Sequence, residues 1–237
     1  MAVTPNSIVT PQTPWSATAV ATTANTTYTD SPTNTVLLAP VYLLNPNPFS
    51  VVNASPTVTV TQAAHGFATG DTTTIAGAAA VGGITPAGAY QVTVLTSSTY
   101  TITHGSNATS TATGGGSAVT VQDSRTSRNG ARITSIKALA RATNTATELQ
   151  LFVSPDGGTT KRFIKSALLS AYTVAATTAQ TGGDFGYTDS SPLILAKNET
   201  LYVGISVTNT GIVFDAQGFA YCCPPSRSDP RAFWPSP

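Results

Sequence analysis

The strongest constraint on this chain is a period-two alternation of apolar residues with polar, mostly β-branched ones. The alternation runs through residues 57–60, 90–94 and 99–103, and its cleanest example is residues 201–208. Successive side chains of a strand point to opposite faces of a sheet, so this pattern is typical of half-buried strands. Threonine supplies many of the polar positions, and its branched Cβ suits a pleated surface. The sequence therefore predicts an all-β fold.

The alternating segments fall into two groups. Residues 53–121 begin and end near Val-Thr-Val runs, and glycines between them permit the positive φ of tight turns. We predict that residues 53–121 form a small inserted β-barrel or sandwich, in which residues 95–98 link a hairpin. The flanking residues, 35–52 and 122–221, are predicted to form a jelly-roll-like β-sandwich body. Within it, residues 133–141 favour a strand, with a short helix as the alternative.

The two ends of the chain lack this alternation. Residues 1–34 carry four prolines among small polar residues, and we predict an extended N-terminal arm. Residues 222–237 form a tail rich in proline, with large aromatic and arginine side chains, the residue types that anchor interfaces. The predicted interaction residues are Trp15, Arg227, Arg231, Phe233 and Trp234.

Composition excludes several classes of protein. Charged residues make up only 9% of the chain and the net charge is +1, whereas a nucleic-acid binder usually carries a basic face. No apolar run approaches the roughly 20 residues that cross a bilayer. The chain does not begin with a secretion signal, and its two cysteines, Cys222 and Cys223, are adjacent, so we expect no disulfide scaffold.

The sequence resembles structural proteins of tailed bacteriophages. In the predicted insert, residues 65–71 (His-Gly-Phe-Ala-Thr-Gly-Asp), residues 82–84 (Gly-Gly-Ile) and the two strands at 90–94 and 99–103 are similar to a small β-domain common in those proteins. Residues 129–133, 144–152 and 193–205 are similar to β-sandwich virion proteins. The resemblance covers about residues 35–221 and implies a virion component, assembled in the host bacterial cytoplasm.

Within that class, we expect a head decoration or cement protein that binds the major capsid protein or other virion proteins. Self-association, with a trimer as the guess from the class, is also expected. We expect no direct contact with nucleic acid or membrane. The alternative is a tail, baseplate or fibre component binding a host-surface glycan, with Tyr90, Tyr100 or Tyr187 as stacking platforms.

Catalytic chemistry has little support in the sequence, and we predict no enzyme, cofactor or metal. The histidines, His65 and His104, have only Asp71 as a nearby acid, so His65 is expected to make a turn hydrogen bond and His104 to end a strand. A virion glycosidase remains the second alternative, with Asp184 and Asp189 as the paired carboxylates. A basic cluster (Arg125, Arg128, Arg132, Lys137, Arg141) has binding of nucleic acid or an acidic protein as one alternative. Because Arg132, Lys137 and Arg141 do not share a strict period of two, with Arg132 and Lys137 an odd number of positions apart, we favour a solvated face or a salt-bridged seam between subunits.

Overall fold

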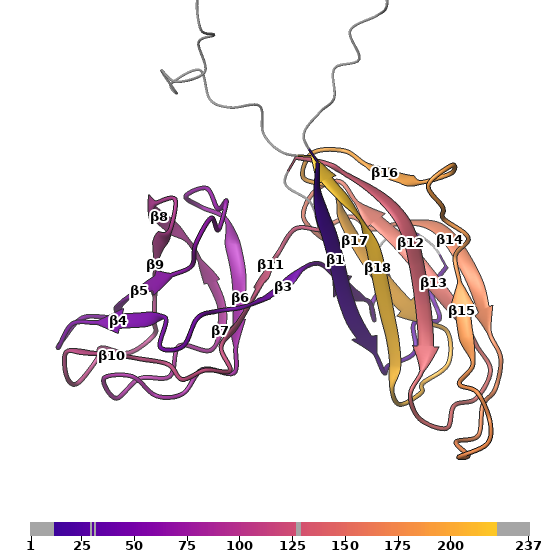
Figure 1. Cartoon of the computed structure of the whole chain (residues 1–237), viewed down its shortest axis with the longest axis horizontal. Coiled ribbons are helices and arrows are strands. Elements are labelled where there is room, and N and C mark those ends of the chain that lie inside the picture. The colour runs from indigo at the N-terminus through magenta and orange to yellow at the C-terminus, as the bar shows by residue number, and fades with distance from the viewer. Residues whose placement is uncertain (1–11, 29, 31, 127–128, 222–237) are drawn as a thin grey trace, which may run out of the picture. The chain divides into compact units, whose positions relative to one another are not determined.

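The computed structural model describes residues 12–28, 30, 32–126 and 129–221, and it places strands but no helix among them. The all-β class is therefore confirmed. The chain divides into two compact units, one formed by Met1–Leu38 with Ser127–Pro237 and the other by Ala39–Thr126. Figure 1 shows the strands of each unit. No helix in the described part of the chain is long and apolar enough to cross a membrane.

The first unit is a sandwich of two antiparallel sheets, which we call sheets I and II. Sheet I has the order β1-β18-β12-β15, and β16 also pairs with β12. Sheet II has the order β14-β13-β17-β2. The strands of sheet I are β1 (Gln12–Ala21), β18 (Ile212–Tyr221), β12 (Ala131–Ala140), β15 (Gly182–Asp184) and β16 (Leu193–Leu195). Those of sheet II are β14 (Arg162–Leu169), β13 (Thr147–Ser154), β17 (Thr200–Ile205) and β2 (Val36–Leu38).

Strand pairing in this unit is nested. The first described strand pairs with the last (β1 with β18), β2 pairs with β17, β12 pairs with β15 and β16, and β13 pairs with β14. Successive pairs fall in alternate sheets, which is the order that a jelly-roll sandwich requires. The second unit interrupts this order in sequence between β2 and β12.

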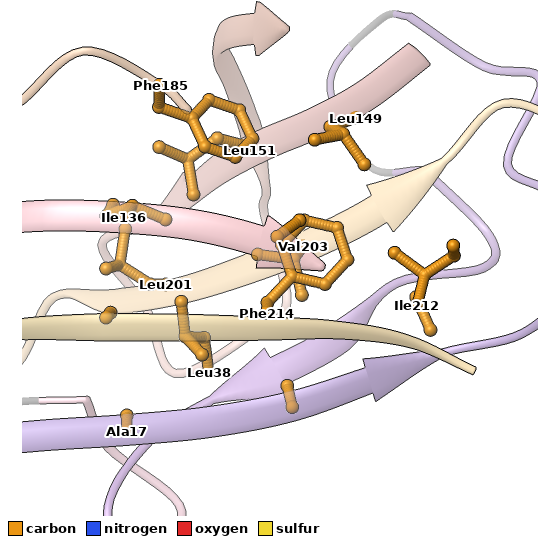
Figure 2. Packing of buried hydrophobic residues seen from close by; sticks show 14 of the residues in the cluster. Ala17, Leu38, Ile136, Leu149, Leu151, Phe185, Leu201, Val203, Ile212 and Phe214 are labelled. Atoms are coloured by element: carbon orange, nitrogen blue, oxygen red, sulfur yellow. The ribbon is translucent and has the colours of Figure 1, made fainter. Parts of the chain in front are cut away.

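The core of the first unit lies between its two sheets. Alternate residues of β18, Ile212, Phe214 and Ala216, are fully buried, and so are Leu201, Val203 and Ile205 of β17. Figure 2 shows side chains of both sheets, Phe214 and Val203 among them, gathered in this core. The sequence alternation at 201–205 therefore corresponds to an inward-facing row.

The second unit also has two antiparallel sheets, with orders β10-β4-β5-β9-β8 and β3-β11-β6-β7. Its core includes Phe49, Val60, Ile75 and Tyr100, each buried. The strands are β3 (Val41–Leu43), β4 (Phe49–Val51), β5 (Thr57–Thr61), β6 (Thr72–Ala76), β7 (Gly88–Gln91), β8 (Thr93–Thr96), β9 (Thr99–Thr103), β10 (Ala112–Gly114) and β11 (Thr120–Asp123).

The structure corrects the predicted N-terminal arm. Of residues 1–34, Gln12–Ala21 form a strand that pairs with β18 along its whole length, and Trp15, Ala17 and Ala19 are buried in the core. Residues 1–11 and the tail 222–237 lie outside the described residues. The compact second unit, Ala39–Thr126, is also wider than the predicted insert at 53–121, because β3 and β4 pair with its strands.

Two local predictions are confirmed. Residues predicted as strand rather than helix at 133–141 lie largely within β12. The hairpin predicted around residues 95–98 joins β8 to β9, and its link is only residues 97–98, because Leu95 and Thr96 belong to β8. Residues 156–158 lie in the turn that joins β13 to β14, another antiparallel pair.

Candidate interaction surface

The outer face of sheet II is covered over β13 and β17 by residues 22–28, which we call the cover segment. Asn25 and Gln150 are both fully buried and are joined by a hydrogen bond of 2.8 Å from Asn25 Nδ2 to Gln150 Oε1. The Asn25 backbone N–H also donates to Ile205 O at 2.7 Å. Phe152, which points to this same face by alternation with Leu151, is fully buried as well. The cover segment therefore closes the part of this face over β13 and β17, whereas Leu168 of β14 stays exposed.

Tyr28 attaches the far end of the cover segment to sheet II. Its ring meets Phe163 edge-on, with centroids 6.3 Å apart, and Phe163 in turn contacts Phe152 at 5.4 Å. Hydrogen bonding to Glu148 raises the pKa of the Tyr28 hydroxyl. Aromatic edge contacts of this kind add to the area that the residues bury.

The outer face of sheet I is open. On β1, Ser16, Thr18 and Val20 are exposed, whereas the residues between them are buried. On β18 the outward positions are those that alternate with Phe214 and Ala216, and Gln217 among them is exposed. This open face of sheet I is the candidate interaction surface.

A hollow of about 480 Å³ lies on this face near the start of β1. Gly218 is among its lining residues, and a Cβ there would collide with Arg132 O and lie 2.7 Å from Ile133 Cα. The pairing of β12 with β18 shifts register between Ile133 and Ser135 at the same place. The residues lining the hollow are Pro14, Trp15, Ser16, Thr134, Gln217, Gly218 and Phe219.

A second depression, a groove of about 450 Å³, lies farther along the same sheet. Two of the three residues of β15 in its lining, Gly182 and Gly183, have no side chain. Lys137 and Asp184 line the groove, and Lys137 Nζ lies 3.8 Å from Asp184 Oδ2. Arg141 also lines the groove and makes no side-chain ion pair or hydrogen bond with any described residue.

The register shift in β12 overturns one argument from the sequence. Arg132 and Lys137 are an odd number of residues apart, so an undisturbed strand would place them on opposite faces. The extra residue of a bulge restores them to one face, and Arg132 lies 3.3 Å from Asp189. A signal was present in the sequence, because the buried Ile133 and Ile136 are spaced by three rather than two.

Of the predicted interaction residues, only Trp15 lies within the described part of the chain. Trp15 is 8% exposed, because its indole packs into the sandwich core while its edge lines the hollow. Arg227, Arg231, Phe233 and Trp234 lie outside the described residues. The chain enters that tail immediately after Tyr221, the Cα partner of Gln12 in the β1-β18 ladder.

The histidine motif of the second unit builds a loop. The Phe67 N–H donates to His65 Nδ1 at 2.9 Å, which confirms the expected turn bond, and the His65 and Phe67 rings stack 5.4 Å apart. Asp71 is buried, accepts the Ala68 N–H at 2.8 Å and forms an ion pair with Arg125. His104 directly follows β9, as predicted, and its Nδ1 accepts the Ser106 N–H at 3.0 Å.

The residues considered for other functions are dispersed or engaged. Tyr100 is fully buried and donates to Gln62 Oε1, so it offers no stacking platform to a glycan. Lys165 covers the Tyr187 ring at 4.6 Å. Asp184 and Asp189 pair with different cations, Lys137 and Arg132, and only Asp184 lines the groove. Among the described residues, no three potential ligand side chains cluster as a metal site would require.

No family model matches the sequence, and no curated protein gives a significant match. Among solved structures, the chain is similar to the phage phi92 endosialidase, with a TM-score of 0.31 and 14% sequence identity. The match covers 52% of this chain and 20% of the endosialidase, so the chain spans about a fifth of that protein. A likeness at this TM-score carries no argument about activity.

Proposed function

We propose that this chain is a structural component of a tailed-bacteriophage virion, and that it acts as a head decoration or cement protein. The resemblance of residues 65–71 and 193–205 to structural proteins of such phages supports the class. The all-β sandwich with an independent second unit suits a protein whose role is to present surface.

The observation that carries the proposal is the asymmetry between the two outer faces of the sandwich. The cover segment buries Gln150 and Phe152 on sheet II, whereas sheet I exposes a broad face with two depressions. The N-terminal residues 1–11 and the tail 222–237 both join sheet I at the same end, because Gln12 and Tyr221 are opposed. The tail that carries the predicted anchors therefore begins at the end of β18, beside the start of β1.

The chemistry of the open face favours contact with a protein. Its charged side chains are largely compensated, with Lys137 near Asp184 and Arg132 near Asp189, so no strong field of one sign is present. Stable interfaces of this kind bury about 1,600 Å² in total and depend on aromatic and arginine anchors. We propose that the face of sheet I and the tail together bind the major capsid protein or another virion protein.

The test uses the full chain and capsids that lack it, from the phage that carries the gene. Cosedimentation is expected for the wild-type chain and is expected to weaken at least tenfold when residues 222–237 are removed. A Leu168→Lys variant is the control, because Leu168 is 71% exposed on β14 of sheet II, away from the proposed contact. Binding to purified tails in place of capsids would replace the head assignment by the tail alternative, and binding to neither particle would overturn the proposal.

A further inference from the structure

Strand β1 is a long sheet edge with little protection. It ends sheet I, pairs with β18 through ten consecutive registered positions, and shows no bulge. On its other side, no described residue forms a ladder with Gln12–Ala21. Figure 1 shows β1 in indigo at the margin of its sheet, beside β18.

Natural proteins usually protect such an edge with charged side chains, proline, bulges or short strands. Of these devices β1 has only Pro14, near its start, and the rest of the strand, from Ser16 to Val20, has none. The first charged side chain of the sequence is Asp30, beyond the end of the strand, and Pro14 is the one residue that lacks a backbone donor. An edge of this length and composition is suited to pair with another strand.

The orientation of the backbone groups follows from a single hydrogen bond. Tyr221 N–H donates to Gly130 O at 3.0 Å, so Tyr221 faces the β12 side of β18. Backbone groups alternate in antiparallel ladders, so Gly218, at an odd number of positions from Tyr221, faces β1. Its Cα partner there is Trp15.

The same alternation fixes the open side of β1. Trp15, Ala17 and Ala19 direct their N–H and C=O groups to β18, whereas the intervening residues direct theirs away from it. Pro14 belongs to the outward set, which explains why a proline is accepted in this strand. The outward N–H groups are those of Ser16, Thr18 and Val20.

We propose that β1 pairs antiparallel with β1 of a second copy of this chain, around a two-fold axis at Thr18. In this register Thr18 faces Thr18 of the other copy, and Ser16 faces Val20, so every outward N–H meets an outward C=O. The strands carry no charge, so self-pairing brings no like charges together, and Thr and Val suit cross-strand contacts. The product is a two-fold dimer in place of the trimer expected from the class. This inference does not depend on the virion assignment.

The first experiment removes one outward donor. Thr18→Pro deletes a backbone N–H that does not bond to β18. Pro14, another outward residue of the same strand, lacks this N–H already. Thr18→Ala, the matched control, changes the side chain and keeps the donor. By light scattering after gel filtration, the wild type and Thr18→Ala are expected to be dimers, and Thr18→Pro is expected to weaken dimerisation at least tenfold.

The second experiment locates the axis and holds even where Thr18→Pro fails to fold. In a Cys222→Ser, Cys223→Ser background, Thr18→Cys places two thiols at opposed positions, where Cα atoms are about 5.5 Å apart in a hydrogen-bonded pair, within disulfide range. Oxidation is expected to give a covalent dimer. Ser16→Cys is the control, because its counterpart across the axis is Val20, and it is expected to stay uncrosslinked.

Three results would overturn the inference. The first is a wild-type chain that stays monomeric at the highest concentration at which it is soluble. The second is a dimer that Thr18→Pro leaves intact, which places the contact on another surface. The third is association that Thr18→Pro abolishes although Thr18→Cys gives no crosslink. In that case β1 pairs with a different segment of the other copy, such as residues 1–11, and not with its β1.

Discussion

Gln12 and Tyr221 are opposed as Cα partners at one end of the β1-β18 ladder. The beginning and the end of the described chain therefore leave sheet I from neighbouring strands, beside the hollow that Trp15 and Phe219 line. This placement brings both ends of the described chain to one end of sheet I. It also separates the part of the N-terminal region that builds the fold from the part that precedes it.

Truncation from the N-terminus should show a sharp boundary. Removal of residues 1–11 leaves the β1-β18 ladder whole, so the melting temperature is expected to stay within a few degrees of the wild type. Removal of residues 1–21 takes away Trp15 and three buried alanines and is expected to abolish cooperative unfolding of the first unit. Differential scanning calorimetry distinguishes the two, and an equal loss from both truncations would contradict the assignment of β1 to the core.

Gly218 is expected to tolerate no side chain. Gly218→Ala places a Cβ against the Arg132 carbonyl at the β12 bulge, where backbone atoms must move, and should lower the free energy of unfolding by about 1–3 kcal/mol. Gly182→Ala on the neighbouring β15 is the control, since its Cβ would lie 3.4 Å from Ala138 O, and a change within about 0.5 kcal/mol is expected. Urea unfolding measures both; equal effects would show that the close approach is not real.

The Asp71–Arg125 pair should stabilise the second unit. Asp71→Ala removes a carboxylate whose side chain is only 4% exposed and leaves both Arg125 and the Ala68 N–H without it. We expect a loss of about 2–4 kcal/mol in that unit's unfolding free energy. Asp189→Ala breaks a pair in which Asp189 is 80% exposed and should cost less than about 1 kcal/mol. If the two variants unfold alike, the buried pair has no such role.

The contribution of Asp156, in the turn between β13 and β14, to folding stability should decrease at acid pH. The Thr160 backbone N–H donates to Asp156 Oδ1 at 2.8 Å and, together with the Ser154 hydroxyl, lowers the pKa of Asp156 to about 2 from 3.8. A lowered folded-state pKa adds stability that is present above the unfolded value and is lost as the pH falls through the folded one. The stability difference between the wild type and Asp156→Asn should therefore be constant at neutral pH and shrink from about pH 4 to pH 2. A difference that stays flat over that range would contradict the pKa.

The sequence predicts the sheets better than it predicts their boundaries. Leu201, Val203 and Ile205 alternate with polar residues and are buried as the pattern requires. In β1 the inward residues are mostly alanines set among serine and threonine, a weak contrast in hydrophobicity, and Pro14 suggests a break although an edge strand accepts it. Because its inward side chains are small, β1 was not predicted as a strand, although its residues are part of the core.

The candidate surface was harder to predict because it depends on a β-bulge and on a contact between residues that are far apart in the sequence. The bulge in β12 puts Arg132 and Lys137 on one face, and the closure of sheet II depends on Asn25 reaching Gln150. Neither relationship has a local pattern beyond the spacing of Ile133 and Ile136. The tail residues Arg227 to Trp234 remain a prediction.

The central claim is that this chain binds other virion proteins through the open face of sheet I. An electron-microscopy map of the intact virion at a resolution that traces strands tests it most directly. The account predicts this chain on the head lattice, with β1, β18 and β12 turned toward neighbouring subunits and the cover segment of sheet II turned to solvent. A map that places sheet II against the neighbours, or that holds no density for this chain, would contradict it.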